Sequence, residues 1–337
     1  MQTYNLCFAG FGNVGRALAL LLEKKRSDLR ECYGVDWRIT GVASRRLGWR
    51  SQPDGFSVPE LLSGTFGGDT AKDVRDWLQA CRADVFFEMT SLNRETGEPA
   101  ITNLRTALEH GAHAISANKG PIIYAYEELR QLAEEKRRRF LFESTVMDGV
   151  PIFSMFRDTL PALYVVGFRA ILNSTTNVVL EQIEQGADLQ AAIRRAQEIG
   201  VAETDPSDDL EGRDSAVKVA ALSTVILGRR LRLDEIEREG ISRLTPDEIR
   251  TARGSGHPYK LLCRAQRQND GRVVASVRPE QLEENDPLAF VNGSSSAIYF
   301  QSDIFPGLAI TEINPGLEAT AYGLLADFVR AVRPASH

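Results

Sequence analysis

The feature that most constrains the fold of this chain is a glycine triplet, Gly10, Gly12 and Gly15, between an apolar segment and a helical one. Tyr4–Ala9 has the composition of a buried strand, and Arg16–Lys25 has that of a helix. In this setting the first glycine permits a tight turn, the second lets backbone approach a pyrophosphate, and the third allows close helix–strand packing. The triplet therefore predicts a dinucleotide-binding turn. The alternative is a plain glycine turn of an α/β domain.

Strand-like and helix-like segments continue to alternate over the first 150 residues. Strands are expected at Trp37–Ser44, Asp84–Met89, Ala114–Ser116 and Phe140–Glu143, and helices at Asp73–Cys81 and Pro99–His110. This alternation is typical of a parallel sheet with helices on both faces. We therefore predict an α/β fold whose N-terminal domain, residues 1–150, is a Rossmann domain with a doubly wound parallel sheet.

A second domain is expected because a chain of 337 residues is too long for most single cores. Its strands are predicted at Leu163–Leu172, Arg272–Val277, Ser296–Gln301 and Leu308–Ile313, with helices around 178–228 covering their sheet. These segments predict an α+β domain over residues 151–314. A final helix is expected at Gly316–Val332.

The end of the second predicted strand bears on the choice of cofactor. It reads Ser44-Arg45-Arg46 and has no acidic residue to bind the ribose hydroxyls of NAD. These three side chains can instead receive the 2′-phosphate of NADP. We therefore predict that NADP is preferred and that NAD is possible. The alternative is that the two arginines belong to a solvated loop.

Two other pairs of residues are candidate cofactor contacts. Asn13 and Val14 open the first helix, where free backbone N–H groups and the positive dipole end favour phosphate. Thr90 and Ser91 follow a predicted strand, and ligands of doubly wound sheets lie at the carboxyl ends of the strands. For the second pair, an ordinary polar turn is the alternative.

Charge and composition narrow the possible partners. The net charge of −6 gives no electrostatic reason to expect nucleic-acid binding. No apolar run approaches the ~18 residues that span a bilayer, and the N-terminus lacks a signal-peptide pattern. We therefore predict a cytoplasmic protein that does not bind a membrane. Its four cysteines are widely spaced and indicate neither a zinc site nor a disulfide framework.

Three charged side chains are candidates for the chemistry. Asp214 and Lys218 lie four residues apart, hence on one face of a largely apolar helix. Buried lysine and aspartate are rare unless they are paired or functional, so we interpret them as a substrate-facing pair. Lys119 follows a predicted strand and is expected at the ligand crevice. The alternatives are a structural ion pair and a surface lysine.

Several motifs occur in one order along the chain. They are the glycine triplet, Ala117-Asn118-Lys119, Glu143-Ser144-Thr145-Val146, Leu172-Asn173-Ser174-Thr175-Thr176-Asn177, the block from Ala202-Glu203 to Lys218, Tyr259-Lys260-Leu261 and Ala319-Thr320-Ala321. With them the chain resembles the homoserine dehydrogenases over almost its whole length. The resemblance implies NAD(P)-dependent interconversion of L-aspartate 4-semialdehyde and L-homoserine, a step in the biosynthesis of threonine and methionine. It also implies a short form without a regulatory domain.

The resemblance further implies roles for individual residues. Lys119 and Lys218 match catalytic lysines, and Lys119 also faces the cofactor. The substrate-binding positions are Thr176, Glu203, Asp209 and Asp214, with Glu203 and Asp214 holding the ammonium group. Gly316 and Glu318 match a segment that returns to the cofactor. The carbonyls of Glu143, Val146, Asp148 and Val150 match a cation site, which we expect to hold sodium.

The resemblance also bears on architecture and assembly. It implies that residues 151–314 form the catalytic and dimerisation domain of a homodimer. It implies that a helix over 315–337 completes the Rossmann domain.

The chemistry of hydride transfer suits these residue types. Negative charge grows on the aldehyde oxygen during reduction, and a nearby lysine stabilises it and can deliver the proton. Two alternatives stay open. Met147, Asp148 and Val201 depart from the family pattern and motivate a related dehydrogenase of another small amino or hydroxy acid. The other alternative is a non-catalytic NADP-sensing protein. The intact set of charged residues argues against it.

Overall fold

The computed structural model describes residues 1–64 and 67–333. They form two compact units. Unit 1 contains Met1–Ser154 and the chain from Gly316 onward, and unit 2 contains Met155–Pro315. The last four residues of the helix expected over 315–337 lie outside the described residues.

The sheet of unit 1 has the strand order β4-β3-β2-β1-β5-β6-β7. The strands are β1 (Gln2–Ala9), β2 (Val35–Ser44), β3 (Gly48–Phe56), β4 (Asp69–Ala71), β5 (Val85–Glu88), β6 (His113–Ser116) and β7 (Phe140–Leu141). From β2 to β7 in this order every pairing is parallel, as predicted.

The β3–β4 edge corrects the prediction of a uniformly parallel sheet. Both β2–β3 and β3–β4 are antiparallel pairs. The chain reverses directly after β2 in a short turn that ends at Gly48, whose φ of 65° suits glycine. Because this reversal needs no crossover helix, the hairpin lacks the strand–helix alternation on which the prediction rested.

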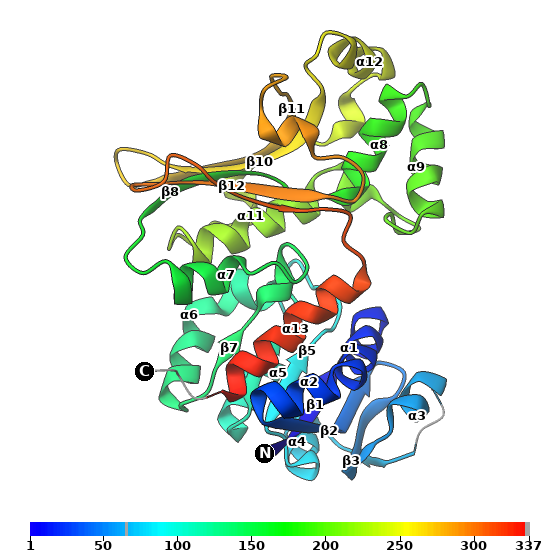
Figure 1. Cartoon of the computed structure of the whole chain (residues 1–337), viewed down its shortest axis with the longest axis vertical. Coiled ribbons are helices and arrows are strands. Elements are labelled where there is room, and N and C mark those ends of the chain that lie inside the picture. The colour runs from blue at the N-terminus through cyan, green and yellow to red at the C-terminus, as the bar shows by residue number, and fades with distance from the viewer. Residues whose placement is uncertain (65–66, 334–337) are drawn as a thin grey trace. The chain divides into compact units, whose positions relative to one another are not determined.

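Two layers of helices cover the sheet of unit 1. Leu6 and Phe8 of β1 share a buried core with α1 (Asn13–Lys24) and α13 (Leu317–Val332), which lie side by side (Figure 1). Cys7, between them, faces Thr40 and Cys81 on the other side of the sheet. That side is covered by α4 (Val74–Cys81), α5 (Ala100–His110) and α6 (Gly120–Glu135). Unit 1 is thus doubly wound, and the layer that contains α1 also includes the last helix of the chain.

The short elements of unit 1 connect this framework. They are α2 (Arg26–Tyr33), α3 (Val58–Ser63), the 3₁₀ turn η1 (Glu143–Thr145) and α7 (Ile152–Ser154). The strand expected at Phe140–Glu143 ends at Leu141, and Glu143 begins the 3₁₀ turn instead.

Unit 2 is built on a mixed sheet with the strand order β13-β12-β8-β10-β11-β9. The strands are β8 (Val165–Ile171), β9 (Ile236–Arg238), β10 (Tyr259–Arg267), β11 (Val273–Gln281), β12 (Ser296–Ser302) and β13 (Leu308–Glu312). The helices α8 (Ser174–Glu184), α11 (Arg213–Val225) and α12 (Pro246–Gly254) pack on β10, and α9 (Leu189–Glu198) packs on α8. The central strand β10 was not predicted as a strand. Within residues 1–64 and 67–333, no helix is long and apolar enough to cross a membrane.

The attachment of α13 to unit 1 yields a stability prediction. Phe328 is 0% exposed, and its ring meets Tyr4 and Phe87 edge to face at centroid distances of 6.0 and 6.4 Å. We expect Phe328→Ala to lower the free energy of unfolding by about 3–5 kcal/mol, measured by urea denaturation. Tyr322→Ala is the matched control, since Tyr322 is 53% exposed on the same helix, and should change it by less than about 0.5 kcal/mol. Equal effects of the two variants would contradict this packing.

Candidate active site

The glycine turn after β1 leaves room for a ligand at one of its three glycines. Gly10 has a φ of 94°, and a Cβ on it would lie 2.4 Å from the carbonyl oxygen of Met89. A Cβ on Gly15 would lie 2.7 Å from the carbonyl oxygen of Gly10. A Cβ on Gly12 would meet nothing within 4 Å. Packing therefore requires Gly10 and Gly15, whereas the space beside Gly12 suits close approach of a phosphate group.

The start of α1 adds donors to this turn. The first i→i−4 bond of the helix runs from the N–H of Arg16 to the carbonyl of Gly12, at 3.0 Å. The N–H groups of Asn13, Val14 and Gly15 precede it and have no carbonyl within the helix to bind. The helix has no acidic residue in its first turn. Its positive dipole end is thus available to an anion.

The turn lies where the winding of the sheet changes direction. β2 flanks β1 on one side and β5 flanks it on the other (Figure 1). Ligands of doubly wound sheets bind at such a switch point, outside the carboxyl ends of the strands. Gly10 follows β1 there, while Thr90 and Ser91 follow β5, and Gly10 approaches Met89 and Thr90 closely. The structure thus brings these candidate cofactor residues together.

Lys119 lies beside the same loop. It is the half-buried N-cap residue of α6, directly after β6. Its neighbour Asn118 donates from Nδ2 to the carbonyls of Thr90 at 3.2 Å and Ser91 at 3.4 Å. The Asn118 Oδ1 atom accepts from the N–H of Gly120 at 2.9 Å. These bonds tie the loops after β5 and β6 to one another.

Glu88 is a residue of this site that the sequence analysis missed. It is fully buried at the end of β5, and its carboxylate accepts from the N–H of Thr90 at 2.9 Å and from the Thr90 hydroxyl. Asn103 Nδ2 donates to its other oxygen at 3.0 Å. Burial raises the pKa of Glu88, although these hydrogen bonds oppose the shift. An acidic residue that closes the apolar run Val85–Phe87 was the available signal.

The residues predicted to select the cofactor lie at the same edge of the sheet. Ser44 ends β2, whose pairing with β1 places Ala43 beside Ala9. Its hydroxyl oxygen accepts from the N–H of Leu47 at 3.2 Å and so helps to form the turn. Arg45 and Arg46 are exposed in that turn. An exposed turn fits both the cofactor hypothesis and the solvated-loop alternative.

The candidate residues at the start of α13 have a different setting. Gly316 is the extended N-cap residue of this helix. Glu318 forms an exposed ion pair with Lys24, at 2.6 Å between Oε1 and Nζ. Lys24 is the last residue of α1, at the opposite end of that helix from Gly12. The Glu318 carboxylate therefore has a partner other than a ligand.

The predicted cation-binding segment is packed against α13. Its acidic side chains are engaged: Glu143 accepts from the N–H groups of Phe153 at 2.6 Å and Ser154 at 2.9 Å, and Asp148 accepts from the Thr320 hydroxyl. In the described part of the chain, no group of three or more His, Cys, Asp or Glu residues is arranged to hold a metal. A cation at this segment would therefore depend on its carbonyl oxygens.

Unit 2 contains the predicted acid–cation pair. Lys218 Nζ lies 3.2 Å from Asp214 Oδ2 on α11, and the two side chains are only 16% and 19% exposed. The same ammonium donates to the carbonyl of Leu172 at 2.6 Å. The pair thus lies beside Leu172, in the segment that leads into α8.

The start of α8 holds two further predicted substrate residues. Asn173 caps the helix by accepting from the N–H of Thr176 at 2.9 Å, and the Thr176 hydroxyl donates to the Asn173 carbonyl at 3.0 Å. Asp209 accepts from Asn173 Nδ2 at 2.7 Å and from the Thr175 hydroxyl at 2.8 Å. Both Asp209 oxygens thus hold the helix start. Glu203 lies in an exposed loop, and across residues 1–64 and 67–333 no hydrogen bond reaches its carboxylate.

The contacts of Glu88 predict an effect on cofactor binding. Glu88→Ala leaves three donor groups, two on half-buried Thr90 and one on buried Asn103, without an acceptor, and we expect it to weaken binding of a nicotinamide cofactor about tenfold. Glu88→Gln is the control, because its amide oxygen can still accept from Thr90. Fluorescence titration of purified protein measures both. Unchanged binding by Glu88→Ala would show that the loop holds its shape without this carboxylate.

Comparison with known proteins gives a consistent result over the whole chain. The family model described as homoserine dehydrogenase matches residues 151–329, and the model of the homoserine dehydrogenase NAD binding domain matches residues 10–143. An NAD(+)-dependent homoserine dehydrogenase of Pseudomonas canavaninivorans is 33% identical, with 98% of this chain and 96% of that protein aligned. A homoserine dehydrogenase of Methanocaldococcus jannaschii is 29% identical, with 96% and 97% aligned.

Solved structures give the same answer. A putative homoserine dehydrogenase from Archaeoglobus fulgidus has a TM-score of 0.85 and 27% identity, covering 97% of this chain and 98% of its own. A hyperthermophilic archaeal homoserine dehydrogenase mutant in complex with NADPH has a TM-score of 0.81 and 25% identity, covering 98% of each chain. The chain therefore belongs to the homoserine dehydrogenase family, whose members are oxidoreductases that act on a CH–OH group.

Proposed function

We propose that this protein interconverts L-aspartate 4-semialdehyde and L-homoserine with a nicotinamide cofactor. The observation that carries this proposal is the largely buried Lys218–Asp214 pair next to the capped start of α8. A cation held in such a place can stabilise charge on a carbonyl oxygen, while acidic groups nearby suit an amino-acid substrate.

The two lysines are assigned the catalytic roles. A bound nicotinamide cofactor would supply the hydride for the aldehyde carbon, so that negative charge develops on the carbonyl oxygen. Lys218 stabilises that oxygen and gives a proton to it, or takes one back in the reverse direction. Lys119, beside the Thr90–Ser91 loop, is assigned to the nicotinamide end of the cofactor and to charge stabilisation.

The substrate is assigned to four side chains of unit 2. Glu203 and Asp214 bind its ammonium group through charge-assisted hydrogen bonds. Thr176 lines the pocket from the first turn of α8. Asp209 shapes that pocket through its bonds to Asn173 and Thr175.

The cofactor is assigned to the edge of the sheet where β1, β2 and β5 end. The pyrophosphate is assigned to Gly10, Gly12, Asn13, Val14 and Gly15. The nicotinamide half is assigned to Thr90, Ser91 and Lys119. Gly316 and Glu318 complete the cofactor-binding set. We propose that Ser44, Arg45 and Arg46 favour NADP and that NAD also serves. The exposed position of both arginines supports their access to a 2′-phosphate.

A bound cation and self-association complete the proposal. Sodium is assigned to the carbonyls of Glu143, Val146, Asp148 and Val150, because hydrogen bonds occupy the nearby carboxylates and leave the carbonyl oxygens as the ligands. A homodimer through the sheet of unit 2 is supported by edge strand β13 and by exposed Phe290 and Ile313, 68% and 77% accessible. The cytoplasmic location stays a prediction.

The direct test is reduction of the cofactor by L-homoserine, followed at the absorbance band of reduced nicotinamide. We expect turnover with both cofactors and a higher kcat/KM with NADP. We expect Lys218→Ala to lose about 10²–10³-fold in kcat while binding NADP as the parent protein does. Near-normal turnover in that variant would remove Lys218 from the mechanism. Lack of turnover in protein that binds NADP would redirect the search to another small amino or hydroxy acid.

A second prediction concerns the arginines of the turn after β2. The double substitution Arg45→Ala with Arg46→Ala should lower kcat/KM for NADP about tenfold or more, since each arginine can form charge-assisted bonds to phosphate. The efficiency with NAD should stay unchanged and serves as the internal control. An equal loss of kcat/KM with both cofactors, or no loss with either, would favour the solvated-loop alternative.

A further inference from the structure

Lys260 is a buried charge for which the proposed reaction has no use. It lies near the start of the central strand β10, is only 3% exposed, and belongs to the motif Tyr259-Lys260-Leu261. Its ammonium donates to the carbonyl of Val291 at 2.6 Å and to Asn292 Oδ1 at 2.9 Å. Both acceptors belong to the loop of residues 291–295, which precedes β12. A buried cation held by a loop indicates that the loop depends on it.

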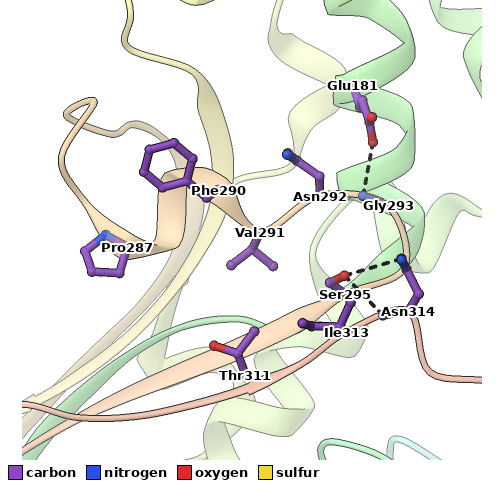
Figure 2. Close-up of a pocket in the computed structure, with 10 residues that line it drawn as sticks. All are labelled: Glu181, Pro287, Phe290, Val291, Asn292, Gly293, Ser295, Thr311, Ile313 and Asn314. Atoms are coloured by element: carbon purple, nitrogen blue, oxygen red, sulfur yellow. Dashed lines mark hydrogen bonds between the residues drawn. The ribbon is translucent and has the colours of Figure 1, made fainter.

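The same loop is bonded along one face of α8. Glu181 Oε2 accepts from the N–H of Gly293 at 3.0 Å, as Figure 2 shows. Ser174 donates from its hydroxyl to the Ser294 carbonyl at 2.9 Å, and Asn177 donates from Nδ2 to the Ser295 carbonyl at 3.2 Å. Positions 174, 177 and 181 are three and four residues apart and therefore lie on one side of the helix.

On another side the 291–295 loop borders a pocket, so its hydrogen bonds matter more for its position. A cavity of about 420 Å³ is lined by four residues of the loop, Val291, Asn292, Gly293 and Ser295, and by Phe290, Thr311 and Ile313 among others (Figure 2). Side chains of this chain do not fill this solvent-open space, so packing within the chain does not restrain the loop there. Its position depends on hydrogen bonds to Lys260, to α8 and to Asn314, which donates its backbone N–H to Ser295 Oγ at 3.2 Å.

We propose that Lys260 is a positioning residue that holds the 291–295 loop against α8 and thereby fixes the substrate-binding start of that helix. The helix start carries Thr176 and the Asn173 cap that Asp209 contacts. This inference rests on the proposed function for the identity of the substrate, but its structural part concerns α8 alone.

The charges around Lys260 make its clamp sensitive to pH. Glu181 and Glu184 face it from α8 and raise the pKa of Lys260, whereas Arg253 of α12, 3.6 Å from Glu184, opposes them. Burial has the largest effect and lowers the pKa of Lys260 from 10.5 to about 8. Opening of the loop returns Lys260 to water, where its pKa is 10.5, so the protonated form favours the open loop. The clamp should therefore tighten as the pH rises through about 8.

Stability against global unfolding should move in the same direction. The unfolded chain binds this proton more tightly than the folded protein, because the pKa of Lys260 is lower in the folded state. For this group alone, stability against unfolding therefore rises with pH between about 8 and 10.5.

The test compares the KM for L-homoserine and the amide hydrogen exchange of the first turns of α8 across this pH range. In the parent protein we expect both KM and exchange, corrected for its intrinsic pH dependence, to fall above about pH 8. Lys260→Met should raise the KM about tenfold and remove the pH step in both measurements, with the KM for cofactor unchanged. Lys136→Met, at an exposed lysine of unit 1, is the matched control and should keep the step.

Asn292→Asp provides the decisive variant, including the case in which Lys260→Met does not fold. A carboxylate next to Lys260 raises the pKa of that lysine, so the step should shift to higher pH. A step that stays in place in Asn292→Asp, or that survives in folded Lys260→Met, would overturn the proposal. Hydrogen exchange does not require turnover, so a step seen there without homoserine oxidation would refute the proposed substrate and retain the role of Lys260.

Discussion

The contact of two backbones at Gly10 determines how the cofactor half of this protein is arranged. No side chain fits between Gly10 and the Met89 carbonyl, so the ends of β1 and β5 meet directly. The loop at Thr90 and Ser91 is thereby placed next to the glycine turn, and Asn118 ties the start of α6 to the same loop. The crevice of the doubly wound sheet is thus formed mainly by backbone contacts, to which side-chain hydrogen bonds are added.

Buried and half-buried ionisable side chains organise both units by binding the chain rather than the solvent. Glu88 holds the loop after β5, Asp209 holds the start of α8, and Lys260 holds the loop before β12. A buried charge must find hydrogen-bonding partners, and loops offer unpaired backbone and side-chain groups. In each case a loop or a helix start acquires a single position next to the proposed site.

The parts of the structure that could be predicted from the sequence are those with local signals. The glycine triplet and the alternation of apolar segments predicted the doubly wound sheet, whereas the β3–β4 hairpin has no such pattern. β10 is buried along much of its length, so its sequence lacks the alternation of a half-exposed strand. The pairing of Asp209 with Asn173 and Thr175 joins distant segments, and no spacing rule contains it. For Glu88, an acidic residue closing an apolar strand was the local signal, and it was overlooked.

The position of α13 has a consequence for the order in which the chain can fold during synthesis. The core of unit 1 includes Leu324 and Phe328, which the ribosome produces after all of unit 2. Unit 2 is one continuous segment and can bury its core as soon as Pro315 has emerged. The glycine turn and its sheet must wait with part of their apolar surface uncovered until translation reaches α13. The nucleotide-binding half, made first, is therefore the half that is completed last.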